Sequence, residues 1–283
     1  MSDLYAASLL KNVGSDLHEI DPKASYKVEG LWYCSKCRKP MQIKVNLNGT
    51  THIIRKACDC EQKEFEKLDQ QEQEKKDREI IKALRRESMM DEASKAHTFD
   101  KFMATEDNVR NFSICRRYAE EFNRMKEKNQ GLLMLGKPGT GKTFAASCIA
   151  NYLLERKVRV VMISLVRLIS IIQTWASEDN VMKTINRAEL LIIDDLGAER
   201  STDFAIERVY NIIDSRYRSK KPMILTTNLS LQEMKETEDL RLARIYDRVF
   251  EVCYPMQFTG KSMRYETAAK RFDEMKNFFG LNS

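Results

Sequence analysis

An eight-residue glycine-rich segment limits the folds open to this chain more than any other feature. Residues 136–143 read Gly-Lys-Pro-Gly-Thr-Gly-Lys-Thr and match the pattern G-x-x-x-x-G-K-[ST] in full. The segment follows an apolar run at 131–135 and opens an amphipathic stretch at 142–156, so it connects a predicted strand to a predicted helix. In that setting, backbone N–H groups of the loop and the helix N-terminus point toward a bound anion. The segment therefore predicts a phosphate-binding loop in an α/β domain.

Apolar runs alternate with amphipathic stretches from about residue 97 onward. The runs are short and almost uniformly hydrophobic, which is typical of parallel strands covered by helices on both faces. The sequence thus predicts an α/β fold with a five-stranded parallel sheet flanked by helices. The predicted strands are 131–135, 158–164, 190–194, 223–227 and 249–254, and the predicted helices are 142–156, 164–176, 202–219, 230–248 and 262–279.

The loop motif assigns nucleotide chemistry to two of its own residues. Lys142 is expected to reach the β- and γ-phosphates of ATP, and the Thr143 hydroxyl is expected to bind Mg²⁺. The backbone and side chains around them are expected to contact ATP or ADP. The predicted nucleotide-binding residues are Gly136, Lys137, Pro138, Gly139, Thr140, Gly141, Lys142, Thr143 and Phe144.

Polar residues follow two later apolar runs of the predicted sheet. Asp194 and Asp195 end the run that starts at residue 190, and Asn228 follows the run at 223–227. Two adjacent carboxylates at the end of a buried strand are costly without a cation. We therefore expect Asp194 to hold Mg²⁺, Asp195 to polarise the attacking water, and Asn228 to orient that water.

Four of the seven cysteines lie close together near the N-terminus. Cys34, Cys37, Cys58 and Cys60 form the pattern C-x₂-C…C-x-C, and four thiolates complete a tetrahedral structural Zn²⁺ site. The region has too few apolar residues for a core of its own, so a metal would supply much of its folding energy. His52 is an alternative ligand, and an iron–sulfur cluster or free thiols are the alternative readings. The other three cysteines are expected to pack as small apolar residues.

A hairpin is predicted between the two cysteine pairs. The β-like runs 41–45 and 51–54 flank Asn48 and Gly49, a strong signal for a two-residue turn. A short helix is predicted at 5–12.

Composition divides the chain into three predicted domains. Residues 1–60 form a zinc-binding module, and residues 61–96, which are rich in charge and lack Gly and Pro, form a helical linker. Residues 97–283 form the nucleotide-binding domain. The net charge of +6 permits a polyanionic partner without requiring one. A mean hydropathy of −0.51 argues against a polytopic membrane protein, and the absence of a secretory signal favours the cytoplasm.

The ordered motifs of residues 97–270 resemble those of AAA+ ATPases, and more narrowly those of DnaC/DnaI-type replicative helicase loaders and the related IstB transposition helpers. The narrower resemblance rests on 98–102, on the Asp-Asp-Leu-Gly ending at 194–197, and on segments 244–248 and 260–264. Several loaders of this kind carry an N-terminal zinc-binding module, and the four cysteines are similar to it with a different spacing.

The resemblance implies further roles for individual residues. Asn228 corresponds to sensor 1, and Arg264 corresponds to the sensor 2 arginine that contacts the γ-phosphate within its own chain. Arg248 corresponds to the arginine finger that reaches a neighbouring subunit's nucleotide, with Arg244 as a rival one helical turn away. Asp195 departs from the glutamate usual in AAA+ proteins, and the shorter side chain fits a slow, switch-like ATPase.

The resemblance also implies a function in the cytoplasm of a bacterial cell, for a protein encoded by the host or by a phage. The expected activity is ATP-dependent loading of a DnaB-type hexameric replicative helicase onto single-stranded DNA, by a homo-oligomer assembled through its nucleotide sites. The N-terminal module and linker would form the helicase-binding arm. Alternatives are an IstB-type transposition helper and a nucleotide-switched adaptor without significant turnover. Candidate DNA-contacting residues are Arg167, Trp175, Lys183 and Arg187, although Trp175 also fits an apolar helix face.

Overall fold

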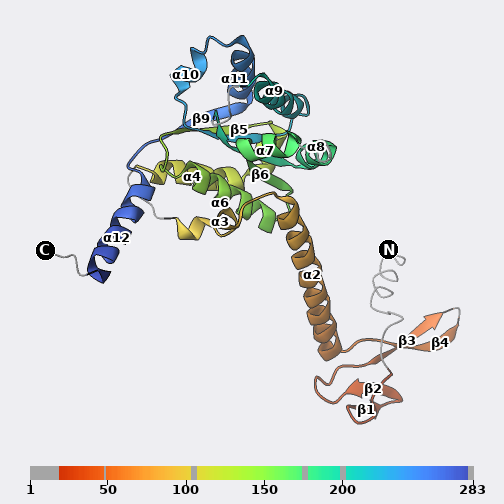
Figure 1. Cartoon of the computed structure of the whole chain (residues 1–283). Coiled ribbons are helices and arrows are strands. Elements are labelled where there is room, and N and C mark those ends of the chain that lie inside the picture. Colours follow the sequence, from red (N-terminus) through yellow and green to blue (C-terminus); the bar gives the residue numbers. More distant parts are fainter. Residues whose placement is uncertain (1–18, 48, 103–106, 174–177, 198–201, 280–283) are drawn as a thin grey trace. The chain divides into compact units, whose positions relative to one another are not determined.

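The computed structural model describes residues 19–47, 49–102, 107–173, 178–197 and 202–279 (Figure 1). The chain divides into two compact units, Met1–Arg78 and Glu79–Ser283, and the boundary falls inside helix α2 (Asp59–Glu87). The helix predicted at 5–12 lies outside the described residues. Among those that are described, no helix is both long and apolar enough to cross a bilayer.

Two antiparallel hairpins make up the described strands of the first unit. Strands β1 (Ser25–Val28) and β2 (Leu31–Cys34) pair with each other, as do β3 (Gln42–Leu47) and β4 (Thr50–Arg55). The second hairpin confirms the predicted one. The first was not predicted, because its turn contains Glu29 with φ 48° and Gly30 with φ 79°, and glutamate is not a typical residue for a left-handed turn position.

Helix α2 contains most of the predicted charged linker. Leu84 is its only buried residue among those described, and its outer turns carry pairs such as Lys76 with Glu72, 2.8 Å apart. The stability of a helix that buries so little apolar surface depends on local side-chain pairs and on contacts at its ends. The chain leaves the helix after Glu87, where Met89 has φ 60°, so the linker is not one continuous helix to residue 95.

The second unit contains a five-stranded parallel sheet with the order β6-β7-β8-β5-β9. This confirms the predicted sheet, and in this order β5, the strand before the glycine-rich segment, lies between β8 and β9, with three strands on one side of it and one on the other. The strands are β5 (Gly131–Gly136), β6 (Val160–Ser164), β7 (Leu190–Leu196), β8 (Met223–Thr227) and β9 (Cys253–Phe258).

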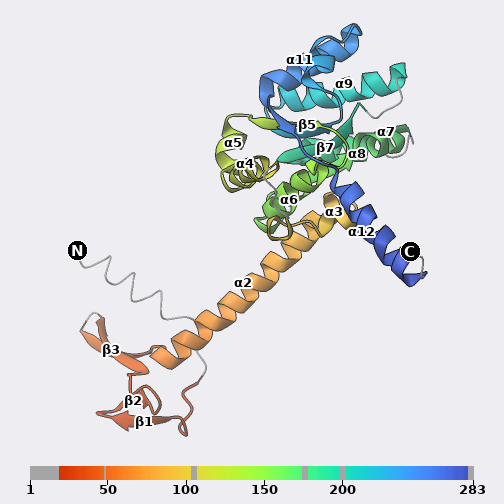
Figure 2. The ribbon, with the colours of Figure 1, turned by 90° about the vertical axis from the view of Figure 1, so that its left-hand side faces the viewer.

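Helices of this unit cover both faces of the sheet, whereas α12 (Met263–Phe278) extends away from it (Figure 2). The other described helices are α3 (Glu92–Lys95), the 3-10 turn η1 (Phe99–Lys101), α4 (Val109–Glu120), α5 (Phe122–Glu127), α6 (Lys142–Glu155), α7 (Leu165–Gln173), α8 (Glu178–Arg187), α9 (Asp203–Arg218), α10 (Leu231–Lys235) and α11 (Leu240–Val252).

Alternate residues along each strand belong to two separate apolar clusters. Leu133 and Leu135 of β5 pack in a cluster with side chains from α7, α8, α9 and α11. Leu132 and Met134 pack on the opposite face with side chains from α4 and α6. The period of two along a strand thus produces two cores, one on each side of the sheet.

Two sequence predictions for the C-terminal half were wrong in detail. The strand predicted at 249–254 begins only at Cys253, because Ile245, Val249 and Val252 recur at helical spacing and form the buried side of α11. The helix predicted at 230–248 is two helices, α10 and α11, and α11 begins where Asp239 accepts a hydrogen bond from the Arg241 N–H at 2.8 Å. Helix α7 is described as Leu165–Gln173, and the rest of the helix predicted at 164–176 lies outside the described residues.

Candidate functional site

The glycine-rich segment connects β5 to α6 as the sequence predicts. Gly136, Gly139 and Gly141 have φ angles of 148°, 83° and 97°. A Cβ atom at Gly139 would lie 2.0 Å from the Oγ atom of Ser262, so a larger residue there would collide with the segment before α12. The loop therefore turns tightly and leads directly into the first turn of α6, where backbone N–H groups lack helical partners.

Lys142 is buried at the centre of this loop. Its Nζ atom donates to the carbonyl oxygens of Gly136 at 2.7 Å and Lys137 at 3.0 Å, and to Oδ1 of Asn228 at 2.9 Å. Burial lowers the pKa of Lys142, and the carboxylate of Asp195 opposes this shift. The ammonium thus lies where the loop meets the end of β8. Its N–H groups could donate to phosphate oxygens in place of these protein acceptors.

Asp194 connects the loop to the neighbouring strands. Its Oδ1 atom accepts hydrogen bonds from the hydroxyls of Thr143 at 2.9 Å and Thr226 at 2.6 Å. Burial raises the pKa of Asp194 above its ordinary value, although the two hydroxyl hydrogen bonds oppose that effect. A carboxylate in contact with a hydroxyl is an oxygen donor set of the kind that Mg²⁺ prefers, so these residues fit the predicted ion.

An open cleft of about 880 Å³ lies beside these residues. Its size suits a ligand as large as a nucleotide. The cleft contains most of the predicted nucleotide-site side chains, among them those from the loop, β7, β8 and α12. Its lining consists of His97, Pro138, Gly139, Gly141, Lys142, Thr143, Phe144, Asp195, Asn228, Met263, Arg264, Ala268, Arg271 and Phe272.

Five residues in this lining were missed by the sequence analysis, namely His97, Met263, Ala268, Arg271 and Phe272. The His97 ring lies 4.5 Å from the Phe144 ring, measured between centroids, and burial lowers the pKa of His97. Arg271 and Phe272 belong to α12. Arg271 is two helical turns after Arg264, so the spacing along the predicted helix contained a signal for it.

Arg248 is not part of this cleft. Its Nη2 atom lies 2.9 Å from Oδ1 of Asp214 and donates to the Tyr210 hydroxyl at 3.0 Å, both on α9. Arg244, one turn earlier on α11, is exposed and lines a smaller cleft of about 400 Å³ together with Tyr210. Neither arginine lines the nucleotide cleft of its own chain. A residue that acts on the nucleotide of a neighbouring subunit would also lie away from its own cleft.

The candidate DNA-contacting residues lie on two helices. Arg167 on α7 is exposed and donates to the Met89 carbonyl at 3.3 Å, and Lys183 and Arg187 are exposed on α8. Trp175 lies outside the described residues. These positions stay candidates.

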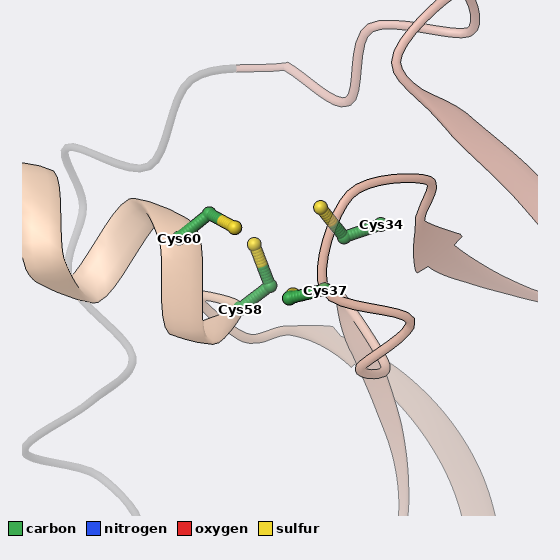
Figure 3. Close-up of side chains that lie close together, drawn as sticks. All are labelled: Cys34, Cys37, Cys58 and Cys60. Carbon is green, nitrogen blue, oxygen red and sulfur yellow. The ribbon is translucent and has the colours of Figure 1, made fainter.

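The four N-terminal cysteines converge in the first unit, as Figure 3 shows. The Sγ atoms of Cys34, Cys37, Cys58 and Cys60 all lie within 4.8 Å of one another, and His52 is not part of this group. Four sulfurs at about 2.3 Å from a central Zn²⁺ would be about 3.8 Å apart. The cluster therefore fits a tetrahedral metal site.

Local backbone structure positions both cysteine pairs. Cys34 ends β2, and the following turn is closed by the Arg38 N–H donating to the Cys34 carbonyl at 2.9 Å. Cys58 and Cys60 flank the start of α2, and the Cys58 N–H donates to Oε2 of Glu61 at 3.0 Å. The second pair thus lies at a helix N-terminus, which favours thiolates.

The thiols of this cluster differ in acidity. Burial raises the pKa of Cys58 to about 12. Burial also acts to raise the pKa of Cys37, but hydrogen bonds from the backbone of Lys39 and Cys60 outweigh it and lower that pKa to about 7. The Cys37 thiol thus ionises more readily than the Cys58 thiol. Such a difference is expected where closely packed thiols interact and the ionisation of one opposes that of the next.

Comparison with known proteins concerns mainly the second unit and the helix that leads into it. The sequence model of the family described as IstB-like ATP binding protein matches residues 61–271. The replicative helicase loader DnaC of Buchnera aphidicola (subsp. Acyrthosiphon pisum) is 30% identical over 159 residues, which cover 54% of this chain and 62% of that protein. The match therefore spans less than two thirds of that relative.

Two solved structures are similar to part of the chain. The crystal structure of a DnaC helicase loader superposes with a TM-score of 0.52 at 25% identity, covering 60% of this chain and all of that one. The crystal structure of DnaI gives a TM-score of 0.53 at 23% identity, covering 62% of this chain and 94% of that one, and supports the fold alone. With the phosphate loop, the parallel sheet and a family match over most of its length, the chain belongs to the IstB-like ATP binding proteins.

Proposed function

We propose that this protein is an ATP-dependent loader that places a DnaB-type hexameric replicative helicase on single-stranded DNA. One observation carries the proposal: Lys142, Thr143, Asp194 and Asn228, from three separate chain segments, meet beside a nucleotide-sized cleft. The name of the curated relative, replicative helicase loader, supports the helicase as the partner.

The site suits hydrolysis of ATP to ADP and phosphate at a slow rate. The Lys142 ammonium would exchange its bonds to loop carbonyls for bonds to the β- and γ-phosphates. Thr143 and Asp194 would hold Mg²⁺, which when bound neutralises charge on the phosphates. Asp195 would polarise the attacking water, Asn228 would orient it, and Arg264, which lines the cleft, would contact the γ-phosphate.

A homo-oligomer would complete the site from a neighbouring subunit. In this proposal Arg248 acts as the finger, and Arg244 is the rival. Arg248 would have to leave Asp214 and Tyr210 to do so, whereas Arg244 is already exposed. The two roles are therefore separable by experiment.

The first unit would serve as the helicase-binding arm, stabilised by Zn²⁺ on its four cysteines. The proposed division into a module (1–60), a linker (61–96) and an ATPase domain (97–283) assigns helicase binding to the part of the chain that the nucleotide site does not need. Exposed apolar side chains on its hairpins, such as Val28 and Ile53, support a role in protein contacts.

The full-length chain with a DnaB-type helicase and circular single-stranded DNA tests the proposal. We expect the wild-type chain to bind the helicase in a pull-down and, with ATP and Mg²⁺, to increase the helicase recovered on DNA circles after gel filtration. Lys142→Ala should lose the ATP-dependent increase. Absence of helicase binding would contradict the loader function, and binding of a transposase instead would indicate the transposition helper. Nucleotide-dependent helicase binding without turnover would indicate the switched adaptor.

A further inference from the structure

Strand β7 is irregular at the point where it presents its two aspartates. Its pairing with β8 runs regularly to Ile193 opposite Leu225, and resumes at Leu196 opposite Thr227. Between these pairs, Asp194 and Asp195 face the single residue Thr226. This two-against-one pairing is a β-bulge, which leaves one residue outside the regular backbone ladder.

The bulge has a conformational cost. Asp195 has φ 57°, in the left-handed region that non-glycine residues rarely adopt. Its N–H is also displaced from the strand's regular hydrogen bonding. Something in the surrounding structure must therefore stabilise this backbone, because the conformation is unfavourable by itself.

Thr226 supplies that support with one hydroxyl. Its Oγ atom accepts a hydrogen bond from the Asp195 N–H at 3.0 Å and donates to Oδ1 of Asp194 at 2.6 Å. Thr226 is fully buried, so water does not compete for these bonds. A hydroxyl has a single hydrogen, so Thr226 can donate only one hydrogen bond, and it donates this bond to Asp194. Each hydrogen bond in the series therefore points the same way, from the Asp195 N–H to the Thr226 hydroxyl and from that hydroxyl to the Asp194 carboxylate.

The next residue stabilises the bulge without touching either aspartate's side chain. The Thr227 hydroxyl donates to the Leu196 carbonyl at 2.7 Å and accepts from the Leu229 N–H at 3.1 Å. Two adjacent threonines of β8 thus have different tasks. Thr227 bonds only to backbone, whereas Thr226 joins the backbone of one aspartate to the carboxylate of the other.

We propose that Thr226 is a positioning residue of the nucleotide site, which orients the Asp194 carboxylate for Mg²⁺ and holds Asp195 in its left-handed conformation. The inference rests on the proposed ATPase function. Thr143 bonds the same oxygen of Asp194 at 2.9 Å, so the two hydroxyls together fix that carboxylate oxygen and leave the second one outside these bonds. Loss of Thr226 would free the carboxylate to rotate and would leave the buried Asp195 N–H without its acceptor.

The test compares variants that keep or remove the hydroxyl. Thr226→Val is nearly isosteric with threonine, and the pair Thr226→Ala and Thr226→Ser differs by one oxygen atom. The readout is the affinity of a fluorescent ATP analogue, titrated with Mg²⁺ and in EDTA, next to the hydrolysis rate and the melting temperature. Thr227→Val is the structural control.

We expect Thr226→Val and Thr226→Ala to bind the analogue in EDTA as the wild type does, and to need about tenfold more Mg²⁺ for half-maximal tightening, the effect of losing one hydrogen bond to a charged group. Hydrolysis should fall by about tenfold or more, and Thr226→Ser should restore both. Thr227→Val should lower the melting temperature and keep the wild-type Mg²⁺ dependence.

If Thr226→Ala and Thr226→Ser needed the same Mg²⁺ concentration for half-maximal tightening, the hydroxyl would have no role and the assignment would be overturned. This comparison holds even if Thr226→Val fails to fold. A melting temperature lowered equally by the threonine 226 and 227 substitutions, with no change in Mg²⁺ dependence, would reduce Thr226 to a structural role and overturn it as well. If the wild-type chain itself showed no Mg²⁺-dependent binding of the analogue, the proposed ATPase function would fail first, and this inference with it.

Discussion

The two compact units of this chain reach stability by different means. In Glu79–Ser283, both faces of a parallel sheet are buried under helices, and fully buried leucines and isoleucines lie in β5, β7 and β8. In the described part of Met1–Arg78, the buried apolar cluster consists of Cys34, Met41 and Cys58, with a few half-buried neighbours. Two of these three side chains are also members of the four-cysteine group.

The difference explains where chemistry can be placed in each unit. The large core makes the nucleotide site rigid enough to tolerate a buried lysine, a bulge and a left-handed aspartate, each of which is unfavourable alone. The first unit lacks such a large core, because small domains bury too little apolar surface to gain much folding free energy from it. Its cysteines are thus expected to act as the core through a metal, and loss of the metal should affect this unit alone.

Removal of zinc is the largest effect that we expect. The wild-type chain should contain one zinc per chain by elemental analysis, and Cys58→Ser should lower that content and open residues 31–60 to hydrogen exchange. Zinc binding contributes roughly 10–16 kcal/mol in zinc-finger peptides, so the unit should not stay folded without it. Hydrogen exchange in β5 to β9 and the rate of ATP hydrolysis should not change.

His52→Ala is the matched control for that experiment. His52 is exposed on β4 and is not part of the four-cysteine group, so its removal should leave the zinc content at the wild-type value. A native chain with no metal, four titratable thiols and a protected first unit would contradict the zinc assignment. Iron with acid-labile sulfide would point to a cluster instead.

Loss of the loop lysine is the next largest effect. Lys142→Ala should reduce hydrolysis by about 10³-fold or more, equivalent to about 4 kcal/mol of transition-state stabilisation, because no other ammonium replaces it at the phosphates. ATP binding should weaken as well. Lys235→Ala is the control, since that side chain is exposed on α10 and does not line the cleft. Wild-type turnover in a folded Lys142→Ala chain would remove the loop from the mechanism.

The sequence was sufficient to predict the alternating strands and helices of the second unit and the loop that carries a motif. The apolar runs gave the five parallel strands, and the glycine pattern located the turn between β5 and α6. The first hairpin was missed because Glu29 gives no turn signal, and the start of β9 was displaced because the buried side of α11 is as apolar as a strand.

The site was predictable to the extent that its residues follow strands. Asp194 and Asn228 were predicted because each follows an apolar run that reads as a buried strand. Thr226 was missed, because the bulge that gives it two partners arises from the pairing of β7 with β8 and leaves no mark in either strand alone. His97 was missed for a similar reason, since it reaches the cleft by packing against Phe144 from a distant part of the chain.

A smaller effect is expected from a buried cation in the core of the second unit. Arg216 on α9 is fully buried and donates to backbone carbonyls, including those of Ala188 at 2.8 Å and Pro222 at 2.7 Å. Arg216→Met should lower the free energy of unfolding by about 3 kcal/mol, because buried acceptors lose their donors. Denaturation of the second unit measures this, with the first unit's hydrogen exchange as an internal reference.

Arg218→Met is the control for the buried arginine. Arg218 is two residues further along the same helix, is 74% exposed, and pairs with Asp214 at 2.7 Å. An exposed ion pair contributes about 0–1 kcal/mol, so this variant should unfold close to the wild type. Equal stability of the Arg216→Met and Arg218→Met chains would contradict a structural role for the buried guanidinium.

The smallest effect is the partial recovery of activity in mixed assemblies, which tests whether one subunit's site depends on its neighbour. On the proposed assignment, a Lys142→Ala chain keeps its arginine finger but has an inactive site, and an Arg248→Ala chain keeps its site but lacks the finger. If Arg248 acts on the neighbouring subunit, mixing the two variants should give hydrolysis a few-fold above the sum of the separate chains. Differently tagged chains and co-purification verify the mixed assembly.

The same mixture with Arg244→Ala decides between the two arginines. Arg248 is held by Asp214 and Tyr210 in its own chain, and reaching a neighbour's nucleotide would require these contacts to break, whereas Arg244 is exposed. Recovery only with Arg248→Ala would mean that assembly releases this arginine, so the contact with Asp214 restrains the isolated subunit. Recovery only with Arg244→Ala would assign the finger to the exposed residue and leave Arg248 as a link between α9 and α11. No recovery with either variant, despite verified mixed assembly, would mean that each site of this chain is complete within one subunit.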